Sequence, residues 1–318
     1  MEGRMRVAVM GAGGLGGLLG GLLAESGHDV ALVARGDHLE AIRSRGLTLT
    51  RDDAPPRVVR VPASDRPEEI GAVDLVLFCV KTYDVDEAAE ASRPLVADRT
   101  TVLPFQNGVE TPERLVRSFG RERVAGGVSY LLGRLERPGV ISYGAIMGGL
   151  LLGELGDRGG ESLRDVAAAF RSARLGAEVV DDIYVAMWEK LVLVCATGGV
   201  MAFMRLPIGR VLDAPEGTSM LRGVMDEAAA VARAAGVPLP ERTVGRHVHF
   251  IETEMAPRAM SSQLVDLLAG RRLELESLNG FVVRLGRRLG VETPLNLRIY
   301  RDLLPYIDGA PVVPAPGP

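Results

Sequence analysis

An uncharged stretch of eighteen residues near the N-terminus, VAVMGAGGLGGLLGGLLA from Val7 to Ala24, constrains the fold more than any other part of the chain. It opens with a valine-rich apolar run, as in a buried strand, and continues with the small residues of a closely packed helix. Between the two stands a G-x-G-x-x-G turn, made of Gly11, Ala12, Gly13, Gly14, Leu15 and Gly16. The first glycine of such a turn allows the bend, the second lets a pyrophosphate approach the backbone, and the third lets the helix pack on the strand. Because a helix N-terminus also offers N–H groups and partial positive charge, the stretch predicts a dinucleotide-binding strand, turn and helix.

A signal peptide or membrane span is the alternative interpretation of the same stretch. Arg4 and Arg6 stand before it, and small residues recur at four-residue spacing, as in Gly13 and Gly17. However, seven of the eighteen residues are glycine, and no A-x-A cleavage site follows. We therefore expect no membrane partner.

The composition favours a globular protein of two domains, because 318 residues exceed one ordinary core. A net charge of −4 gives no broad electrostatic case for nucleic acid or an anionic membrane as a partner. Cys79 and Cys195 lie in apolar runs and predict buried free thiols, while His247 and His249 lack partners at metal-ligand spacing. We expect a cytoplasmic protein without a metal site.

The end of the second predicted strand indicates which nicotinamide cofactor is used. The apolar run Val30–Ala34 leads into Arg35 and Gly36. At this point of a dinucleotide-binding fold an acidic side chain binds the 2′-hydroxyl of NAD, whereas an arginine suits the 2′-phosphate of NADP. Arg35 therefore predicts NADPH/NADP⁺ as the cofactor. Two alternatives stay open, namely Arg35 as a solvated loop residue and Asp37 as an acid that would serve NAD.

Two further predicted strands end in polar residues. The run Asp74–Val80 ends at Lys81, and Thr100–Phe105 ends at Gln106-Asn107-Gly108. Ligands of doubly wound sheets bind at the carboxyl ends of the strands. Lys81 is therefore placed to reach an anion of the cofactor or substrate, and the Asn-Gly turn to present an amide beside the nicotinamide. A surface lysine and a purely structural turn are the alternatives.

Predicted strands and helices alternate as far as Val180, which favours an α/β fold, a Rossmann domain built on a parallel sheet. Further strands are expected at 124–130, 139–143, 150–154 and 177–180, helices at 38–45, 88–95 and 163–173, and irregular or edge β structure at 47–61. The boundary is expected near Asp181-Asp182. This gives an NADP-binding domain at 1–181 and a helical substrate and catalytic domain at 182–318.

Helical spacing replaces the strand signals from Ile183 onward, so the C-terminal domain is expected to be all-helical. Helices are expected at 186–204, 220–235, 261–269, 274–289 and 295–304, and the proline-rich tail of about 310–318 is expected to be disordered. Within the first helix, fourteen uncharged residues, LVLVCATGGVMAFM, follow Lys190 and predict a central buried helix.

Three polar residues of this half are candidates for chemistry. Burial lowers the pKa of a lysine toward neutral pH, so Lys190 is a candidate proton donor. A lysine that extends its ammonium to solvent from the helix end is the alternative. Taken alone, Ser262 fits a helix-start residue and Glu274 a solvated helix charge.

Together, and in this order, the motifs resemble those of the ketopantoate reductase (2-dehydropantoate 2-reductase) family. The shared features are the glycine turn, Arg35-Gly36, Lys81, Gln106-Asn107-Gly108, Lys190, and a stretch with Ser261-Ser262, Glu274 and Asn279-Gly280. The resemblance covers about residues 5–307. It implies a Rossmann domain followed by an all-helical domain, with the active site in the cleft between them. It also implies NADPH-dependent reduction of a 2-oxo acid on the route to pantothenate.

The resemblance implies a role for each matching residue. Lys190 matches the family's general acid, and Glu274 the carboxylate that positions the substrate hydroxyl. Ser262 matches a contact to the substrate carboxylate, Asn107 a residue that touches substrate and cofactor, and Lys81 a lysine on the cofactor and substrate side. These residue types fit the chemistry, since hydride transfer to a ketone leaves an alkoxide that a lysine ammonium can stabilise and protonate.

The chain departs from the family at two positions on the helix of Lys190. Well-studied members carry substrate-contacting asparagines four and eight residues after the lysine, where this chain has Val194 and Gly198. A polar group left unpaired in a buried site costs about 1–3 kcal/mol. Thr197 is the only hydroxyl nearby. We therefore expect shallow selectivity among branched 2-oxo acids, with preference shifted away from ketopantoate.

The leading hypothesis is an NADP-dependent oxidoreductase that reduces a 2-oxo acid to a 2-hydroxy acid, with 2-dehydropantoate (ketopantoate) to pantoate as the first candidate reaction. One alternative is a reductase of a more apolar 2-oxo acid, and another is an NADP(H)-sensing protein without turnover. Lys190 with Glu274 favours an enzyme, because a sensor needs no acid pair. A homodimer is left open.

Overall fold

Two compact units make up the chain in the computed structural model, which describes residues 4–144, 149–156 and 161–309. The first unit comprises the residues up to Gln106 together with Glu110–Ile183. The second comprises the residues from Tyr184 onward together with Asn107–Val109. Three residues from the first half of the chain thus belong to the second unit.

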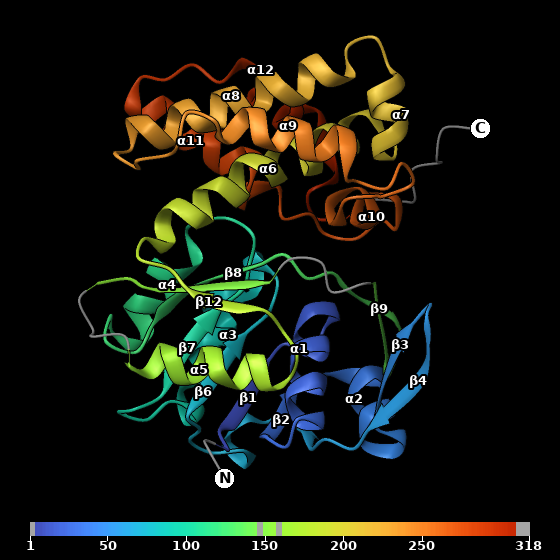
Figure 1. Ribbon diagram of the computed structural model, residues 1–318, viewed down its shortest axis with the longest axis vertical. Coiled ribbons are helices and arrows are strands. Elements are labelled where there is room, and N and C mark those ends of the chain that lie inside the picture. Colours follow the sequence, from blue (N-terminus) through green and yellow to red (C-terminus); the bar gives the residue numbers. More distant parts are fainter. Residues whose placement is uncertain (1–3, 145–148, 157–160, 310–318) are drawn as a thin grey trace. The chain divides into compact units, whose positions relative to one another are not determined.

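A five-stranded parallel sheet lies at the centre of the first unit, with the strand order β5-β2-β1-β6-β7 (Figure 1). Its strands are β1 (Arg6–Met10), β2 (Asp29–Val33), β5 (Ala63–Ser64), β6 (Leu75–Phe78) and β7 (Thr101–Pro104). All residues of β6 and β7 are buried, as expected for a parallel sheet covered on both faces. Because β1 pairs with β2 on one side and with β6 on the other, the strand order reverses there. The predicted Rossmann arrangement is confirmed, and its ligand site belongs at the carboxyl ends of β1 and β6.

Helix α1 (Gly14–Glu25) lies between this sheet and a second one, which explains its many glycines. The second sheet has the order β4-β3-β10-β9 and consists of β3 (Leu47–Arg51), β4 (Ala54–Val59), β9 (Gly133–Arg137) and β10 (Val140–Tyr143). On one side of α1, a Cβ atom at Gly20 would lie 2.6 Å from Cδ2 of Leu32 in β2. On the other side, a Cβ atom at Gly17 would lie 3.0 Å from Cγ1 of Ile141 in β10. The helix therefore needs small residues on two faces to approach both sheets.

The second sheet corrects two sequence expectations. The segment 47–61, expected to be irregular or edge β, forms two paired strands, and β3 lies inside the sheet. Strand β9 was not predicted, because its sequence GRLER is polar and mostly exposed and has no alternating apolar pattern.

A third sheet and several helices complete the first unit. The sheet has the order β12-β11-β8, formed by β8 (Ala125–Ser129), β11 (Leu150–Glu154) and β12 (Ala177–Val179). The helices are α2 (Gly36–Arg45), α3 (Val85–Ala91), α4 (Thr111–Phe119), α5 (Glu161–Ser172) and the 3₁₀ turns η1 (Pro67–Glu69), η2 (Thr82–Asp84) and η3 (Arg93–Leu95). Helix α4 was missed by the sequence analysis, although its buried residues Pro112, Leu115 and Phe119 recur at helical spacing.

In its described part, the second unit contains helices and no strand (Figure 1). They are α6 (Ile183–Met204), α7 (Ile208–Asp213), α8 (Gly217–Ala234), α9 (Thr243–Thr253), α10 (Ser262–Leu268), η4 (Leu275–Ser277), α11 (Asn279–Leu289), α12 (Pro294–Leu303) and η5 (Leu304–Tyr306). Helices α7 and α9 were not predicted. The expected disordered tail at 310–318 lies outside the described residues.

Helix α6 is the apolar centre of the second unit. By length and composition it could cross a membrane, and no other described helix meets that test. However, 72% of its apolar window is buried, and Leu191, Cys195 and Val200 are fully enclosed. Its packing is that of a core helix, as the uncharged run predicted.

A buried polar network holds α6 to its neighbours. Asn279 Nδ2 donates to Cys195 O at 3.1 Å and to Asn296 Oδ1 at 2.9 Å. Asn296 Nδ2 in turn donates to Glu227 Oε2 at 2.8 Å, which ties α6, α8, α11 and α12 together. One predicted boundary is wrong here, because the helix expected at 274–289 is interrupted at Leu278 and α11 starts at Asn279.

Candidate functional site

The glycine turn has the geometry that the spacing predicted. Gly11 has φ +95°, a conformation that suits glycine, and a Cβ atom there would lie 2.9 Å from the backbone nitrogen of Val80. A Cβ atom at Gly16 would overlap Gly11 O, so the start of α1 can lie close to the turn only without a side chain. Gly13 differs from both, because a Cβ atom there would have no heavy atom within 4 Å. The turn is thus closely packed at its first and third glycines and open at its second.

The N-terminus of α1 is suited to an anion. Gly13 is its N-cap residue, no side chain caps the helix, and its first turn carries no acidic residue. The first N–H groups of a helix have no partner within the helix and carry partial positive charge. A dinucleotide pyrophosphate could therefore lie against the open face of Gly13 and accept these N–H groups.

His38 holds the glycine turn in place, and the sequence analysis did not single it out. Gly139 N donates to His38 Nδ1 at 2.9 Å, and His38 Nε2 lies 2.8 Å from Ala12 O. Since Nδ1 accepts, the proton of the neutral ring is assigned to Nε2, which donates to Ala12 O. Nothing local in the sequence signals this role, because Gly139 lies 101 residues away.

Arg35 stands at the carboxyl end of β2, where an adenosine ribose binds in this fold. It is the N-cap residue of α2, and its guanidinium is exposed. Arg35 Nη2 lies 3.4 Å from Glu87 Oε1, and both side chains are more than half exposed, so the pair constrains the arginine little. Asp37, the alternative NAD ligand, lies in the first turn of α2 and is exposed.

Gln106 connects the ends of β6 and β7. Its Nε2 donates to Phe78 O and Val80 O, both at 2.9 Å. These bonds fix the backbone just before Lys81, which is partly buried beyond the end of β6. Lys81 therefore lies at the same edge of the sheet as the glycine turn, although the two come from different strands.

The Asn-Gly turn belongs to the second unit and packs on η4. Gly108 has φ +100°, and a Cβ atom there would lie 2.9 Å from Ser277 O. Since η4 begins directly after Glu274, the turn brings Asn107 into the same unit as Lys190 and Glu274. The conformation of Gly108 is required by this close approach as well as by the turn.

Lys190 and Glu274 interact, although 84 residues separate them. Burial lowers the pKa of Lys190 to about 8, and the carboxylate of Glu274 opposes that shift. Both side chains are partly buried. An amine with this pKa carries a proton near neutral pH and can release it, as a general acid must. The interaction with Glu274 fits the acid pair better than the alternative of a lysine extended into solvent.

Ser262 starts its helix, as its structural interpretation expected, but it does not cap it. The capping residue of α10 is Ser261, whose Oγ accepts from Leu264 N at 3.1 Å. Ser262 is the first residue of α10, and its side chain is exposed.

The predicted site residues therefore fall into two sets. The glycine turn, Arg35 and Lys81 belong to the first unit, and Asn107, Lys190, Ser262 and Glu274 belong to the second.

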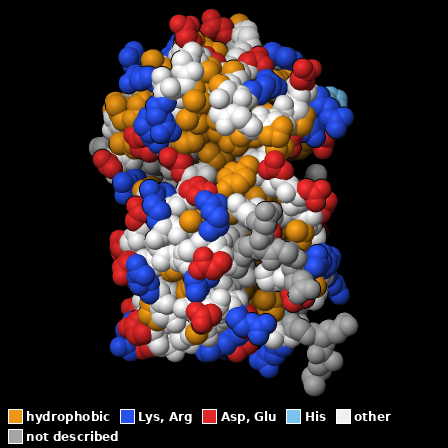
Figure 2. Space-filling view, turned by 90° about the vertical axis from the view of Figure 1, so that its left-hand side faces the viewer, with side chains coloured by type: hydrophobic (Ala, Val, Ile, Leu, Met, Phe, Trp, Pro, Cys, Tyr) orange, Lys and Arg blue, Asp and Glu red, His pale blue; other side chains and the backbone are white. Residues whose placement is uncertain are grey.

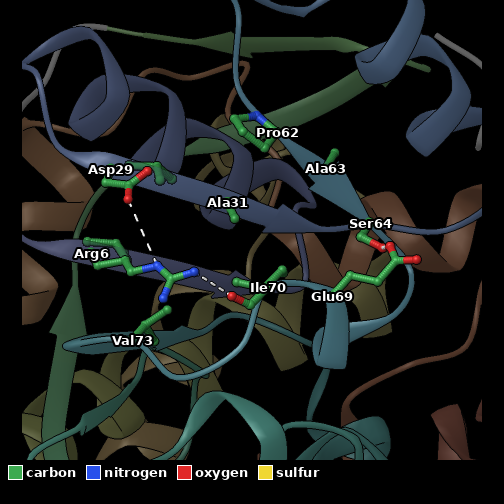
Figure 3. Close-up of a pocket in the computed structure, with 11 residues that line it drawn as sticks. Arg6, Asp29, Ala31, Pro62, Ala63, Ser64, Glu69, Ile70 and Val73 are labelled. Carbon is green, nitrogen blue, oxygen red and sulfur yellow. Dashed lines mark hydrogen bonds and ion pairs between the residues drawn. The ribbon is translucent and has the colours of Figure 1, made fainter.

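A cavity of about 300 Å³ lies at the opposite end of the central sheet (Figure 3). Arg6 and Asp29, the first residues of β1 and β2, line it, with Arg6 Nε 3.9 Å from Asp29 Oδ2. The glycine turn follows the carboxyl end of β1, whereas this cavity lies at the amino ends. It is therefore not part of the candidate site.

The part of the chain that the structure describes shows no metal site and no disulfide. No group of three or more His, Cys, Asp or Glu side chains there could hold a metal ion. Cys79 and Cys195 are free thiols, and burial raises the pKa of Cys79 to about 12. Acidic and basic side chains are interspersed over the face seen in Figure 2.

Comparison with known proteins gives matches along nearly the whole chain. Residues 7–157 match the family described as ketopantoate reductase PanE/ApbA, and residues 182–305 match its C-terminal part. A 2-dehydropantoate 2-reductase of Archaeoglobus fulgidus is 33% identical, covering 96% of this chain and 97% of that protein. The crystal structure of a PanE/ApbA family ketopantoate reductase from Ralstonia eutropha JMP134 is 37% identical with a TM-score of 0.86, covering 95% of this chain and 98% of that one. A D-mandelate dehydrogenase solved with NADH and anilino(oxo)acetate has the same fold, with a TM-score of 0.88 at 22% identity over 95% of this chain and 98% of that one.

Proposed function

Because the chain belongs to the ketopantoate reductase family, a family of dinucleotide-dependent oxidoreductases, we propose that it reduces 2-dehydropantoate (ketopantoate) to pantoate with NADPH. The observation that carries this proposal is the pairing of Lys190, with its pKa lowered to about 8, and Glu274. A protein that only senses NADP(H) would need the glycine turn but no such acid.

The residues of the first unit fit the cofactor. The open face of Gly13 and the uncapped N-terminus of α1 would take the pyrophosphate. The exposed guanidinium of Arg35 would pair with the 2′-phosphate, and Lys81 would add positive charge at the end of β6. When bound, NADPH supplies the hydride.

Lys190 completes the reduction by giving a proton. A ketone carbon that gains a hydride becomes an alkoxide, which the Lys190 ammonium stabilises by charge and then protonates on oxygen. Glu274 keeps the lysine charged at neutral pH and positions the substrate hydroxyl. Ser262 and Asn107 donate hydrogen bonds to the substrate, and Ser262 takes its carboxylate.

A more apolar 2-oxo acid is the second candidate substrate. It is favoured by Val194 and Gly198, which stand on the helix of Lys190 where related enzymes carry asparagines. The small 2-oxo acid is the partner in both cases. A cytoplasmic location and a homodimer stay predictions.

The test is oxidation of NADPH against a panel of 2-oxo acids, namely ketopantoate, 2-oxoisovalerate and pyruvate. We expect steady oxidation with ketopantoate, and a turnover about 10²- to 10⁴-fold lower in Lys190→Ala. Higher kcat/KM for 2-oxoisovalerate than for ketopantoate would establish the apolar alternative. If the protein binds NADPH tightly but none of these acids oxidises it, the remaining interpretation is an NADP(H)-sensing protein without turnover.

A further inference from the structure

Gln263, the second residue of α10, has a buried carboxamide with no partner in the described structure. Its exposed fraction is 3%, and neither Nε2 nor Oε1 makes a hydrogen bond. The other orphaned amides are different, because Gln106 and Asn279 each keep their nitrogen paired. Buried polar groups are nearly always paired, so an amide with both ends unpaired indicates a missing ligand.

Gly198 places this residue beside the helix of the proposed acid. A Cβ atom at position 198 would lie 3.8 Å from Gln263 Cβ, and no other heavy atom outside α6 would lie within 4 Å. Gly198 follows Lys190 by eight residues, or about two helical turns, so the two share one side of α6. The absent side chain therefore leaves a space beside Gln263.

Helix α6 offers no substitute of its own at this point. Val194 is aliphatic, and the hydroxyl proton of Thr197 is already used, because Oγ1 donates to Leu193 O at 2.9 Å. Gln263 is thus the side chain that lies beside position 198, where an asparagine side chain is missing.

We infer, on the basis of the proposed reductase function, that the Gln263 carboxamide binds the hydroxyl group of the substrate, in addition to the contact proposed for Glu274. An alcohol both donates and accepts a hydrogen bond, and a carboxamide offers both an acceptor, Oε1, and a donor, Nε2. The substrate class is then a hydroxylated 2-oxo acid, of which ketopantoate is one. In this chain α10 supplies the amide that related enzymes carry on α6. We therefore expect the protein to recognise the hydroxyl, in place of the shallow selectivity expected from Val194 and Gly198.

The test compares ketopantoate with 2-oxoisovalerate, which lacks the hydroxymethyl group, in Gln263→Met. Methionine keeps the length and approximate volume of glutamine and removes the amide. We expect kcat/KM for ketopantoate to fall about 10- to 100-fold, the usual loss for one buried hydrogen bond. For 2-oxoisovalerate we expect a change below about threefold, because that substrate makes no such bond.

Two further variants separate recognition from packing. Leu267→Met changes a buried side chain of the same helix and should leave the ratio of the two substrates unchanged. Gly198→Asn in the Gln263→Met background should restore part of the preference for ketopantoate, since an amide returns to the same space. If Gln263→Met does not fold, Gln263→Asn provides the comparison, because it withdraws the amide by one methylene.

Thermal unfolding is the second readout. Removing an unpaired buried amide should leave Tm unchanged or raise it. Equal losses for both substrates, an unchanged ratio, or a lower Tm with both activities lost would overturn the assignment. If the unmodified protein reduces no 2-oxo acid, the proposed function fails. In that case, calorimetry decides the role of Gln263 separately. It compares the affinities of the unmodified protein and Gln263→Met for pantoate and for 2-hydroxyisovalerate in the presence of NADP⁺.

Discussion

Lysine occurs at only two positions of this chain, 81 and 190, although lysine and arginine together number 37. Arginine keeps its charge at every physiological pH, whereas a lysine loses its proton readily once it is buried. The burial of Lys190 and the lowering of its pKa to about 8 therefore distinguish it from the 35 arginines. The chain keeps a lysine where the proposed reaction needs a releasable proton.

The first prediction at this scale concerns the pH dependence of turnover. The proposed acid role requires Lys190 to be protonated, so kcat/KM should be highest well below pH 8 and fall as pH rises through about 8. Glu274 raises the pKa of Lys190, so Glu274→Gln should move this alkaline limb to lower pH. Lys190→Ala should lower kcat by about 10²- to 10⁴-fold and leave NADPH affinity nearly unchanged.

Reductive ¹³C-methylation can measure the same pKa directly by NMR. Only Lys81, Lys190 and the α-amino group can carry the label, so Lys81 serves as the internal comparison. A Lys190 signal that titrates near the ordinary lysine value, or near-normal turnover in Lys190→Ala, would return this residue to the solvent-extended interpretation.

A second prediction concerns Arg35 and the choice of cofactor. NADPH should bind more tightly than NADH, and Arg35→Ala should remove most of the difference, worth about 1.5–3 kcal/mol or roughly ten- to a hundredfold in Kd. Glu87→Gln is the matched control, because it removes the partner of the exposed ion pair and keeps the guanidinium. Fluorescence titration with both cofactors gives six dissociation constants, two for each of the three proteins. Equal affinities in the unmodified protein would refute the assignment of NADP(H).

At the scale of elements, α1 joins packing and binding in one short helix. Gly20 is needed because Leu32 and Val9 lie against it, whereas a Cβ atom at Gly13, just before α1, would meet no heavy atom within 4 Å. The two glycines therefore have different reasons to lack a side chain. The missing side chain of Gly20 lets α1 pack closely between two sheets, and the missing side chain of Gly13 leaves space for the proposed pyrophosphate.

Alanine substitution should separate the two reasons. Gly20→Ala should lower stability, because overpacking of about 1–3 kcal/mol exceeds the roughly 1 kcal/mol that alanine adds to a helix. Gly13→Ala should lower Tm only slightly, since φ −66° suits alanine and the space is open while alanine is the poorer N-cap residue, but it should weaken NADPH binding. Thermal melts with and without NADPH measure both effects. A Gly13→Ala protein that binds NADPH normally would place the cofactor elsewhere.

At the scale of the whole molecule, the division into two units does not follow the order of the chain. Asn107–Val109 follow a strand of the first unit yet pack with the second, against Ser277. A boundary near 181 accounts for the change from strands to helices but cannot reveal this exchange. The carboxyl end of β7 thus leads directly into the unit that holds Lys190 and Glu274.

The sequence by itself determined the features that depend on neighbours along the chain. The glycine turn between β1 and α1, the buried strand β6 and the apolar helix α6 follow from spacing and from uninterrupted apolar runs, which are local properties. The family resemblance rested on the same local motifs, and it placed Lys190 and Glu274 as a pair before any contact was known.

Only the tertiary structure decided what depends on contacts between distant residues. Gly17 and Gly21 of α1 are explained by a second sheet whose strands come from residues 47–59 and 133–143, and the turn is held by His38 and Gly139. Gln263 looks like an ordinary polar helix residue until its burial beside Gly198 is seen. Local patterns fix which segments are strands or helices, but the free energy of each polar side chain depends on what surrounds it after folding.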